Sequence, residues 1–469
     1  MTTAEIWTVM PILILACGAL VVLLLGAIAP GRHGVLIGVV ALFAAALWCL
    51  VPRTQTAATT LGVSLTPFGR FFTILFSLTA AAVLLLSHGY NERRGIRGEE
   101  YPATILFAVF GMAVLSASTN FLALFLGLEG LTFAFYFLVA IDRERPASGE
   151  AGLKYLLMGA VAAAFTAFGI ALMYAGTGSL AIVTVMKALS AGEKANPLFL
   201  AGAGLLLAGI AFKISLVPAH LWTPDVYEGA PTPVVAFLST ASKGAAVVFL
   251  LLLLPAAGGV TSLHVPLWGL SFLSMVVGNL AALLQRNLKR MLAYSAVAQM
   301  GYVTLALLSG ETGGFEAAAF YVVAYTVMNL AAFGAVASLS GESELDTLDG
   351  YRGLGYSRPF FGGVLALAMF ALAGIPPTAG FVGKFFIFAA AVKGGEVALA
   401  VIGILSAVAS VYYYLRVVVN LYMQPAEQVV AISRGTLPEL VALATATAVI
   451  LIVGIFPGPL MDLVASFFR

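Results

Sequence analysis

Five basic residues lie within stretches of sequence that are otherwise almost wholly apolar. They are Lys154, Lys213, Lys243, Lys384 and Arg416. Glu129 is the one acidic residue near the middle of such a stretch. A lysine in a low-dielectric environment can lose its proton near neutral pH, whereas an arginine stays charged. Lysines and a glutamate placed in this way are typical of a series of groups that pass protons.

Simpler interpretations exist for some of these residues. Lys154 stands at the start of its apolar stretch and could extend to the membrane surface, as Arg416 near the end of its stretch is expected to do. Glu129 could neutralise one lysine in a static pair. Each such group costs about 3 kcal/mol to place in hydrocarbon, so a purely structural chain would avoid them. The predicted proton relay therefore comprises Glu129, Lys154, Lys213, Lys243 and Lys384.

The composition requires a membrane for these stretches. Among 469 residues, 9% are charged, where a soluble globular chain carries roughly 25%. Hydrophobic residues make up 61%, and the mean hydropathy is +1.05. The net charge of +2 excludes a basic surface for nucleic acid. The two cysteines, Cys17 and Cys49, exclude a disulfide framework, and their spacing predicts no iron–sulfur or zinc site.

Fourteen stretches are apolar over about 20 residues, the length at which a helix crosses a bilayer. They cover residues 9–29, 35–51, 68–87, 102–118, 119–141, 154–176, 197–217, 234–254, 265–285, 291–309, 315–340, 359–390, 397–422 and 438–457. We therefore predict an all-α polytopic membrane protein with about 14 transmembrane helices. Loops on the side opposite the termini carry about twice as many Lys and Arg residues, so both termini are expected outside the cytoplasm.

Two of the predicted spans carry prolines beside a lysine. Pro218 follows Lys213, and Pro376 and Pro377 precede Lys384. Proline interrupts helical hydrogen bonding, and irregular backbone at membrane depth is tolerated only when it is buried in protein or lines a cavity. Paired breaks in the two halves of a chain indicate an ion path between inverted repeats. Kinks that serve packing alone are the alternative.

The two breaks are five spans apart, which predicts inverted five-helix repeats over spans 4–8 and 9–13. The chain is accordingly divided into four parts: an N-terminal three-helix segment (1–101), a first repeat (102–254), a second repeat (255–422) and a C-terminal helix (423–469). Four polar side chains are candidates for an auxiliary proton path. They are His220, which lies at the first break, and Gln299, Tyr294 and Tyr302. Hydrogen bonding at a helix end is the alternative for His220, and helix packing is the alternative for the tyrosines.

Longer segments of the sequence also point to a known protein family. Residues 213–233 read KISLVPAHLWTPDVYEGAPTP. This string resembles the signature of the antiporter-like membrane subunits of respiratory complex I, and its wording is similar to that of the subunit N branch in bacterial NADH-quinone oxidoreductases. Residues 288–295 and 374–384 are similar to the same family. The resemblance covers essentially the whole chain.

The resemblance implies a role for each buried charge. Glu129 and Lys213 match the family's coupled acid–lysine pair, and Lys243 matches its central relay. Lys384 matches the terminal lysine at the outward exit, and Lys154 matches a lysine near a subunit boundary. The family is also known for 14 helices with spans 7 and 12 broken.

The same resemblance implies a proton-translocating subunit of the bacterial inner membrane. Electron transfer from NADH to quinone would take place in other subunits, which would hold FMN, iron–sulfur clusters and quinone, while this chain would bind no cofactor or metal. The expected partners are a neighbouring antiporter-like subunit, small helical subunits and a hydrophilic electron-transfer arm.

One position departs from the family. A histidine is frequent there in the tenth span, but this chain has Gln299. An amide does not gain or lose a proton at accessible pH, so water held by Gln299, Tyr294 and their neighbours would have to transfer the proton. Three other interpretations stay open. They are a subunit of a Mrp-type cation/proton antiporter, a membrane subunit of a related hydrogenase or dehydrogenase complex, and a scaffold with a vestigial channel.

Overall fold

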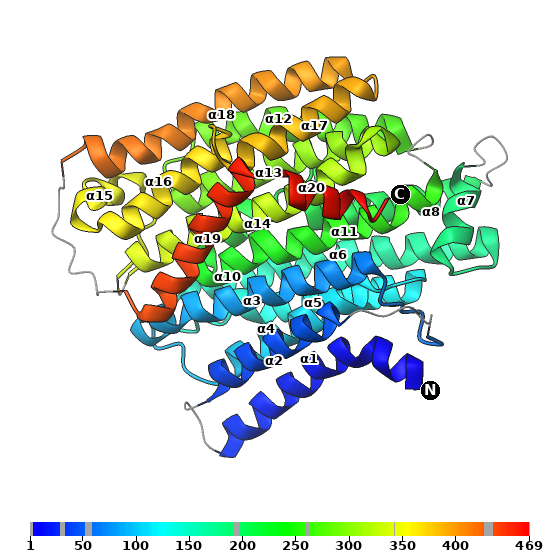
Figure 1. The fold of residues 1–469 in the computed structure, drawn as a ribbon, viewed down its shortest axis with the longest axis horizontal. Coiled ribbons are helices and arrows are strands. Elements are labelled where there is room, and N and C mark those ends of the chain that lie inside the picture. The colour runs from blue at the N-terminus through cyan, green and yellow to red at the C-terminus, as the bar shows by residue number, and fades with distance from the viewer. Residues whose placement is uncertain are drawn as a thin grey trace.

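The computed structural model describes residues 3–28, 33–51, 59–190, 197–258, 263–341, 343–425 and 435–468. Within these ranges the chain is a stack of helices that run roughly side by side (Figure 1). Eleven of the helices are long and apolar enough to cross a membrane. The prediction of an all-helical membrane fold is confirmed, while the count of 14 spans stays a prediction, because three further apolar helices are shorter than a full span.

The first half of the chain contributes the helices at the bottom of the view and part of the centre of the stack (Figure 1). They are α1 (Thr3–Ile28), α2 (Gly34–Leu50), α3 (Pro67–Arg93), α4 (Glu100–Ser116), α5 (Phe121–Val139), α6 (Pro146–Thr177), α7 (Ile182–Ser190), α8 (Pro197–Ile214), α9 (Trp222–Gly229), α10 (Thr232–Phe237), the π-helix η2 (Leu238–Ser242) and α11 (Lys243–Leu253). The last three form one continuous rod with the turn that follows them.

The second half of the chain supplies the rest. Its helices are α12 (His264–Leu283), α13 (Leu288–Leu308), α14 (Gly314–Leu339), α15 (Leu354–Ser357), α16 (Pro359–Ala373), α17 (Ala379–Lys393), α18 (Val397–Met423), α19 (Leu437–Ile455) and α20 (Gly458–Ala465). The predicted span 359–390 is thus two helices, α16 and α17, separated by the segment that holds Pro376 and Pro377. In the same way α8 stops at Ile214, just before Pro218.

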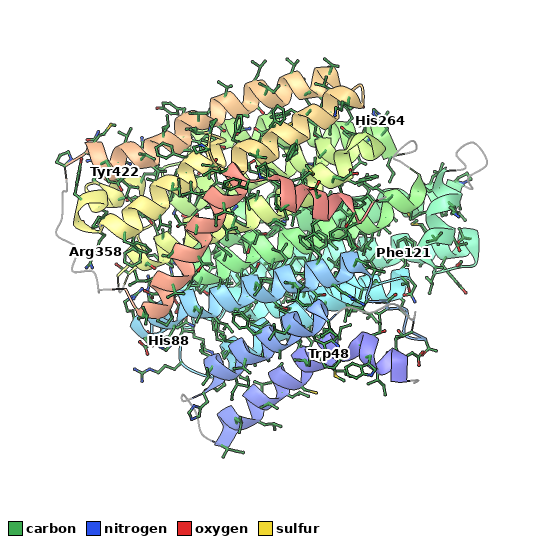
Figure 2. The ribbon with its side chains drawn as sticks, viewed as in Figure 1. Trp48, His88, Phe121, His264, Arg358 and Tyr422 are labelled. Atoms are coloured by element: carbon green, nitrogen blue, oxygen red, sulfur yellow. The ribbon has the colours of Figure 1, made fainter. Side chains whose placement is uncertain are left out.

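Helices α10–α11, α13 and α14 form the centre of the stack and are almost wholly buried. Helices α1, α6, α12, α18 and α19 are largely exposed and carry Leu, Val, Ile and Phe outward, which suits contact with lipid. Both ends of the described chain lie at the same end of the helices (Figure 1). Figure 2 shows His88, Arg358 and Tyr422 at the opposite end, and Phe121 and His264 near the end that holds the termini.

Candidate functional site

Glu129 and Lys213 are in contact. Glu129 lies on α5 and Lys213 near the end of α8, and the Oε1–Nζ distance is 3.3 Å. The lysine also donates a hydrogen bond of 2.7 Å to Oγ1 of Thr132, one turn along α5 from Glu129. Only 4% of the Lys213 side chain is exposed, against 22% for Glu129. The ammonium is therefore buried between a carboxylate and a hydroxyl of the same helix.

Lys243 lies beside this pair. Its Nζ donates to the carbonyl oxygen of Ile214 (3.1 Å) and to Oγ of Ser215 (2.5 Å). Ile214 ends α8, so its carbonyl has no partner in the helix, and the partial negative charge of a helix C-terminus favours a cation there. Ser215 has a φ of 71° as the chain leaves the helix. Because Ile214 directly follows Lys213, Lys243 is joined to the Glu129–Lys213 pair through the backbone at the end of α8.

Aromatic side chains enclose the Lys243 ammonium. Its Nζ lies 5.6 Å from the ring centre of Trp222 and 5.9 Å from that of Tyr227, both on α9. Trp222 is held by stacking on Tyr155 of α6 (4.6 Å between ring centres) and by a hydrogen bond from its Nε1 to the Phe212 carbonyl (2.9 Å). Rings at this distance stabilise a cation through their π faces.

Lys384, in the second half of the chain, likewise lies at the C-terminus of a helix that ends at a break. Its Nζ donates to the carbonyl oxygens of Leu372 (2.8 Å) and Ala373 (3.1 Å), the last two residues of α16. The ring of Tyr302 lies 5.5 Å from Nζ. Each buried amine thus meets two opposing effects, since burial disfavours its charge and a helix C-terminus favours it. In the described part of the chain, Lys384 and Lys243 have separate sets of partners.

Gln299 belongs to the Lys384 group. Its Nε2 donates to the Leu372 carbonyl (3.2 Å), which also accepts from Lys384, and to the hydroxyl of Tyr414 (3.1 Å). Its Oε1 accepts from the hydroxyl of Tyr321 (2.5 Å). Tyr414 could not be picked out from the sequence, because it lies in a run of tyrosines within a predicted span and nothing distinguishes it from its neighbours.

The other residues predicted for the auxiliary proton path lie near one of the two helix breaks. His220 is buried in the turn between α8 and α9, with its ring 6.2 Å from that of Tyr294. The Tyr302 hydroxyl bonds with Asn279 and Ser406, each at 3.0 Å. The structure therefore places His220 and Tyr294 together near the first break and Tyr302 near the second.

Lys154 differs from the other three lysines. Its side chain is 44% exposed, and its Nζ lies 2.7 Å from Glu150 and 3.1 Å from Asp225. Helix α6 begins at Pro146, so Lys154 is two turns inside the helix rather than at its start. Arg416 is partly buried and donates to the Gln285 carbonyl.

Comparison with known proteins gives the same family throughout. Residues 118–410 match the family described as NADH:quinone oxidoreductase/Mrp antiporter, TM. The chain is 65% identical to NADH-quinone oxidoreductase subunit N of Geotalea uraniireducens (strain Rf4), over 100% of both chains. It is 63% identical to the protein of that name in Geobacter metallireducens (strain ATCC 53774 / DSM 7210 / GS-15), again over 100% of both chains.

Solved structures agree. A chain of respiratory complex I from Thermus thermophilus with bound aureothin superimposes with a TM-score of 0.84 and 33% identity, covering 96% of this chain and 98% of that one. A chain of the Mrp complex from Dietzia sp. DQ12-45-1b gives a TM-score of 0.85 at 19% identity, covering 100% of this chain and 97% of that one, a likeness of fold alone.

Proposed function

Since the chain belongs to the subunit N family of NADH-quinone oxidoreductase, we propose that it forms one proton channel of that complex. It is a membrane subunit of a multisubunit assembly, and electron transfer from NADH to quinone takes place in other subunits, which hold the cofactors. The observation that carries the proposal is the Glu129–Lys213 ion pair with the buried Lys243 amine at the carbonyl that follows Lys213, since a static scaffold has no need of two amines there.

The channel works by electrostatic coupling. When a charge moves in the neighbouring subunit, Glu129 changes its partnership with Lys213. The proton of Lys213 then passes by way of Lys243 to Lys384, which releases it on the outer side. Each step needs only Coulomb coupling across a low-dielectric interior. Gln299 and Tyr302 beside Lys384, and His220 and Tyr294 near the first break, hold the water of this path.

The wider organisation follows the same proposal. The chain has 14 spans, with inverted repeats over spans 4–8 (residues 102–254) and 9–13 (residues 255–422) between an N-terminal segment (1–101) and a C-terminal helix (423–469). Both termini face the periplasm. This organisation is supported by the shared end of the termini and by the two helix breaks, at each of which a lysine binds the C-terminus of the preceding helix, α8 or α16. Lys154, exposed on α6, lies at the boundary with the neighbouring subunit.

The test is proton pumping by the assembled complex in inverted membrane vesicles. We expect Lys213→Ala and Lys384→Ala to lose most proton uptake per NADH oxidised. Lys393→Ala is the matched control, because Lys393 lies on the same helix as Lys384 but is exposed. Normal pumping by Lys213→Ala, with normal amounts of assembled complex, would reject the relay.

A further inference from the structure

Residues 222–233, which we call the linking segment, join the broken helix α8 to the rod α10–α11. The segment holds α9, a short turn and the first residues of α10. Because the rod is one continuous helix from Thr232 onward, the position of its first turn sets the position of Lys243 against the Ile214 carbonyl.

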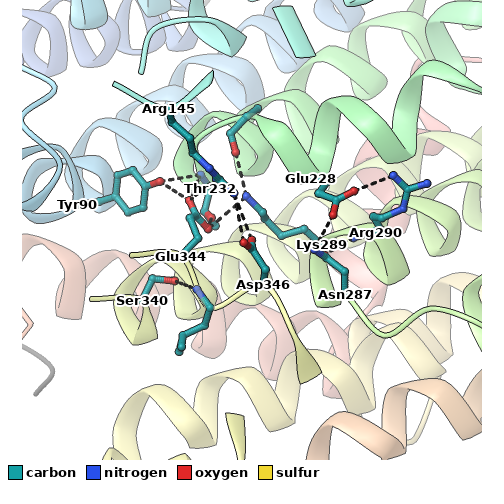
Figure 3. A network of polar contacts seen from close by, with 12 residues as sticks. Tyr90, Arg145, Glu228, Thr232, Asn287, Lys289, Arg290, Ser340, Glu344 and Asp346 are labelled. Carbon is teal, nitrogen blue, oxygen red and sulfur yellow. Dashed lines mark hydrogen bonds and ion pairs between the residues drawn. The ribbon is translucent and has the colours of Figure 1, made fainter. Parts of the chain in front are cut away.

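A buried carboxylate accepts hydrogen bonds from the start of this rod. Glu344 lies in the loop after α14, and only 2% of its side chain is exposed. Oγ1 of Thr232 donates to its Oε2 at 2.6 Å, and the Thr232 backbone N–H donates to its Oε1 at 3.4 Å. The hydroxyl of Tyr90 on α3 donates to the same Oε1. Figure 3 shows these groups converging on Glu344.

Two cations neutralise the carboxylate. Nζ of Lys289, at the start of α13, lies 3.2 Å from Glu344 Oε2 and donates to the Ala230 carbonyl of the linking segment at 3.0 Å. Nη1 of Arg145 lies 3.8 Å from Oε1, and its Nη2 hydrogen-bonds Asp346 at 3.3 Å (Figure 3). Burial by itself raises the pKa of Glu344, but the Lys289 ammonium and the bonds from Thr232 and Tyr90 lower it to about 2.

Residues at the start of α13 also bind α9. Nη1 of Arg290 lies 2.7 Å from both Asp225 and Glu228, and Nδ2 of Asn287 donates to Glu228 at 3.1 Å. The linking segment belongs to the first half of the chain, whereas α13 and the Glu344 loop belong to the second. The ion pairs therefore fasten one half to the other at the segment that positions Lys243.

We propose that Glu344 is a positioning residue for proton transfer, which through Thr232 and Lys289 fixes the linking segment and so keeps Lys243 against the break in α8. The inference rests on the proposed function. The negative charge is needed as well as the hydrogen bonds. A neutral amide at position 344 could still accept from Thr232, but it would leave the wholly buried Lys289 ammonium without its counter-charge, which is strongly unfavourable.

The experiment compares variants of the assembled complex in inverted membrane vesicles. NADH oxidation, proton uptake and the amount of complex are measured together. Glu344→Gln and Lys289→Gln are each expected to lose most proton uptake per NADH while electron transfer continues. Asp349→Asn is the matched control, since Asp349 follows in the same region but is 64% exposed and pairs only with Arg352 among its described contacts.

Two further variants keep the test decisive. The double variant Glu344→Gln with Lys289→Gln removes both charges, so it is expected to recover proton uptake relative to either single change. A merely structural loss of packing would not recover. If the Glu344→Gln complex fails to assemble, Thr232→Val decides, because it removes one 2.6 Å bond and leaves every charge; partial loss of proton uptake is expected.

Normal proton uptake by Glu344→Gln, or by Thr232→Val in its place, would overturn the inference, as would a double variant that recovers nothing. Lys213→Ala, measured in the same preparation, separates this failure from failure of the channel itself. If Lys213→Ala pumps normally, the proposed function is wrong. If it loses pumping while the Glu344 variants keep theirs, only the positioning role is wrong.

Discussion

Replacing Glu129 by Gln removes one charge and almost no volume, so it tests the electrostatic step directly. The Glu129 and Lys213 charges are 3.3 Å apart. At an effective dielectric constant of about 20 their attraction is about 5 kcal/mol. Because Glu129 is 22% exposed, solvent screens part of this attraction, and about 2–3 kcal/mol is a realistic remainder. That remainder is the coupling between the two charges that Glu129→Gln removes.

The assay is proton uptake by inverted membrane vesicles, with NADH oxidation measured in parallel. In Glu129→Gln we expect NADH oxidation to continue and proton uptake per NADH to fall severalfold. Thr132→Val is the control, because it removes the 2.7 Å hydrogen bond to Lys213 and leaves both charges in place. Its loss should be smaller. Parental proton uptake in Glu129→Gln, with normal complex content, would refute the electrostatic reasoning.

Four further outcomes are expected. Lys243→Arg keeps a charge and its donors but cannot release a proton, so the complex should assemble and lose proton uptake; parental uptake would make Lys243 only a helix cap. Gln299→His keeps a donor and adds a titratable group, so proton uptake should stay at the parental level or above; a loss would mean that the amide itself is required. Lys154→Ala removes exposed ion pairs, which solvent screens, so its thermal stability should be nearly parental and its uptake should exceed that of Lys213→Ala. The carboxylate of Glu344 has its pKa lowered from 4.5 to about 2, so its contribution to stability is fully present above about pH 5 and is lost as the pH falls toward 2; thermal melts of the parental complex and of Glu344→Gln, compared across pH, should show this difference. Glu344→Gln should lack that contribution, and an identical acid profile would contradict it.

Most helix positions follow from apolar length. The predicted span 315–340 is α14, Gly314–Leu339, and the predicted span 397–422 is α18, Val397–Met423. Hydropathy locates these helices well because a chain in hydrocarbon must satisfy its backbone internally. It locates α6 poorly, since that helix starts at Pro146 and runs through polar residues before Lys154. Hydropathy marks only the part of a helix that lies in hydrocarbon, and the helix can extend beyond that part.

The site was predictable only in part. The buried lysines were visible because their residue type conflicts with their surroundings. Their acceptors were not, because backbone carbonyls such as that of Leu372 carry no sequence signature and become available only where a helix ends. Glu344 was missed for the opposite reason, since an acid in a polar loop conflicts with nothing until the fold buries it.

The arrangement at the second break argues against a purely structural role for Lys384. The Leu372 carbonyl accepts from two donors, Nζ of Lys384 and the neutral amide of Gln299. Gln299 is therefore sufficient to satisfy that carbonyl without bringing a charge into the membrane. Lys384 also binds the Ala373 carbonyl, but a neutral donor could supply that bond without the cost of about 3 kcal/mol for placing a charge in hydrocarbon. What an amine adds over an amide is the ability to gain and lose a proton.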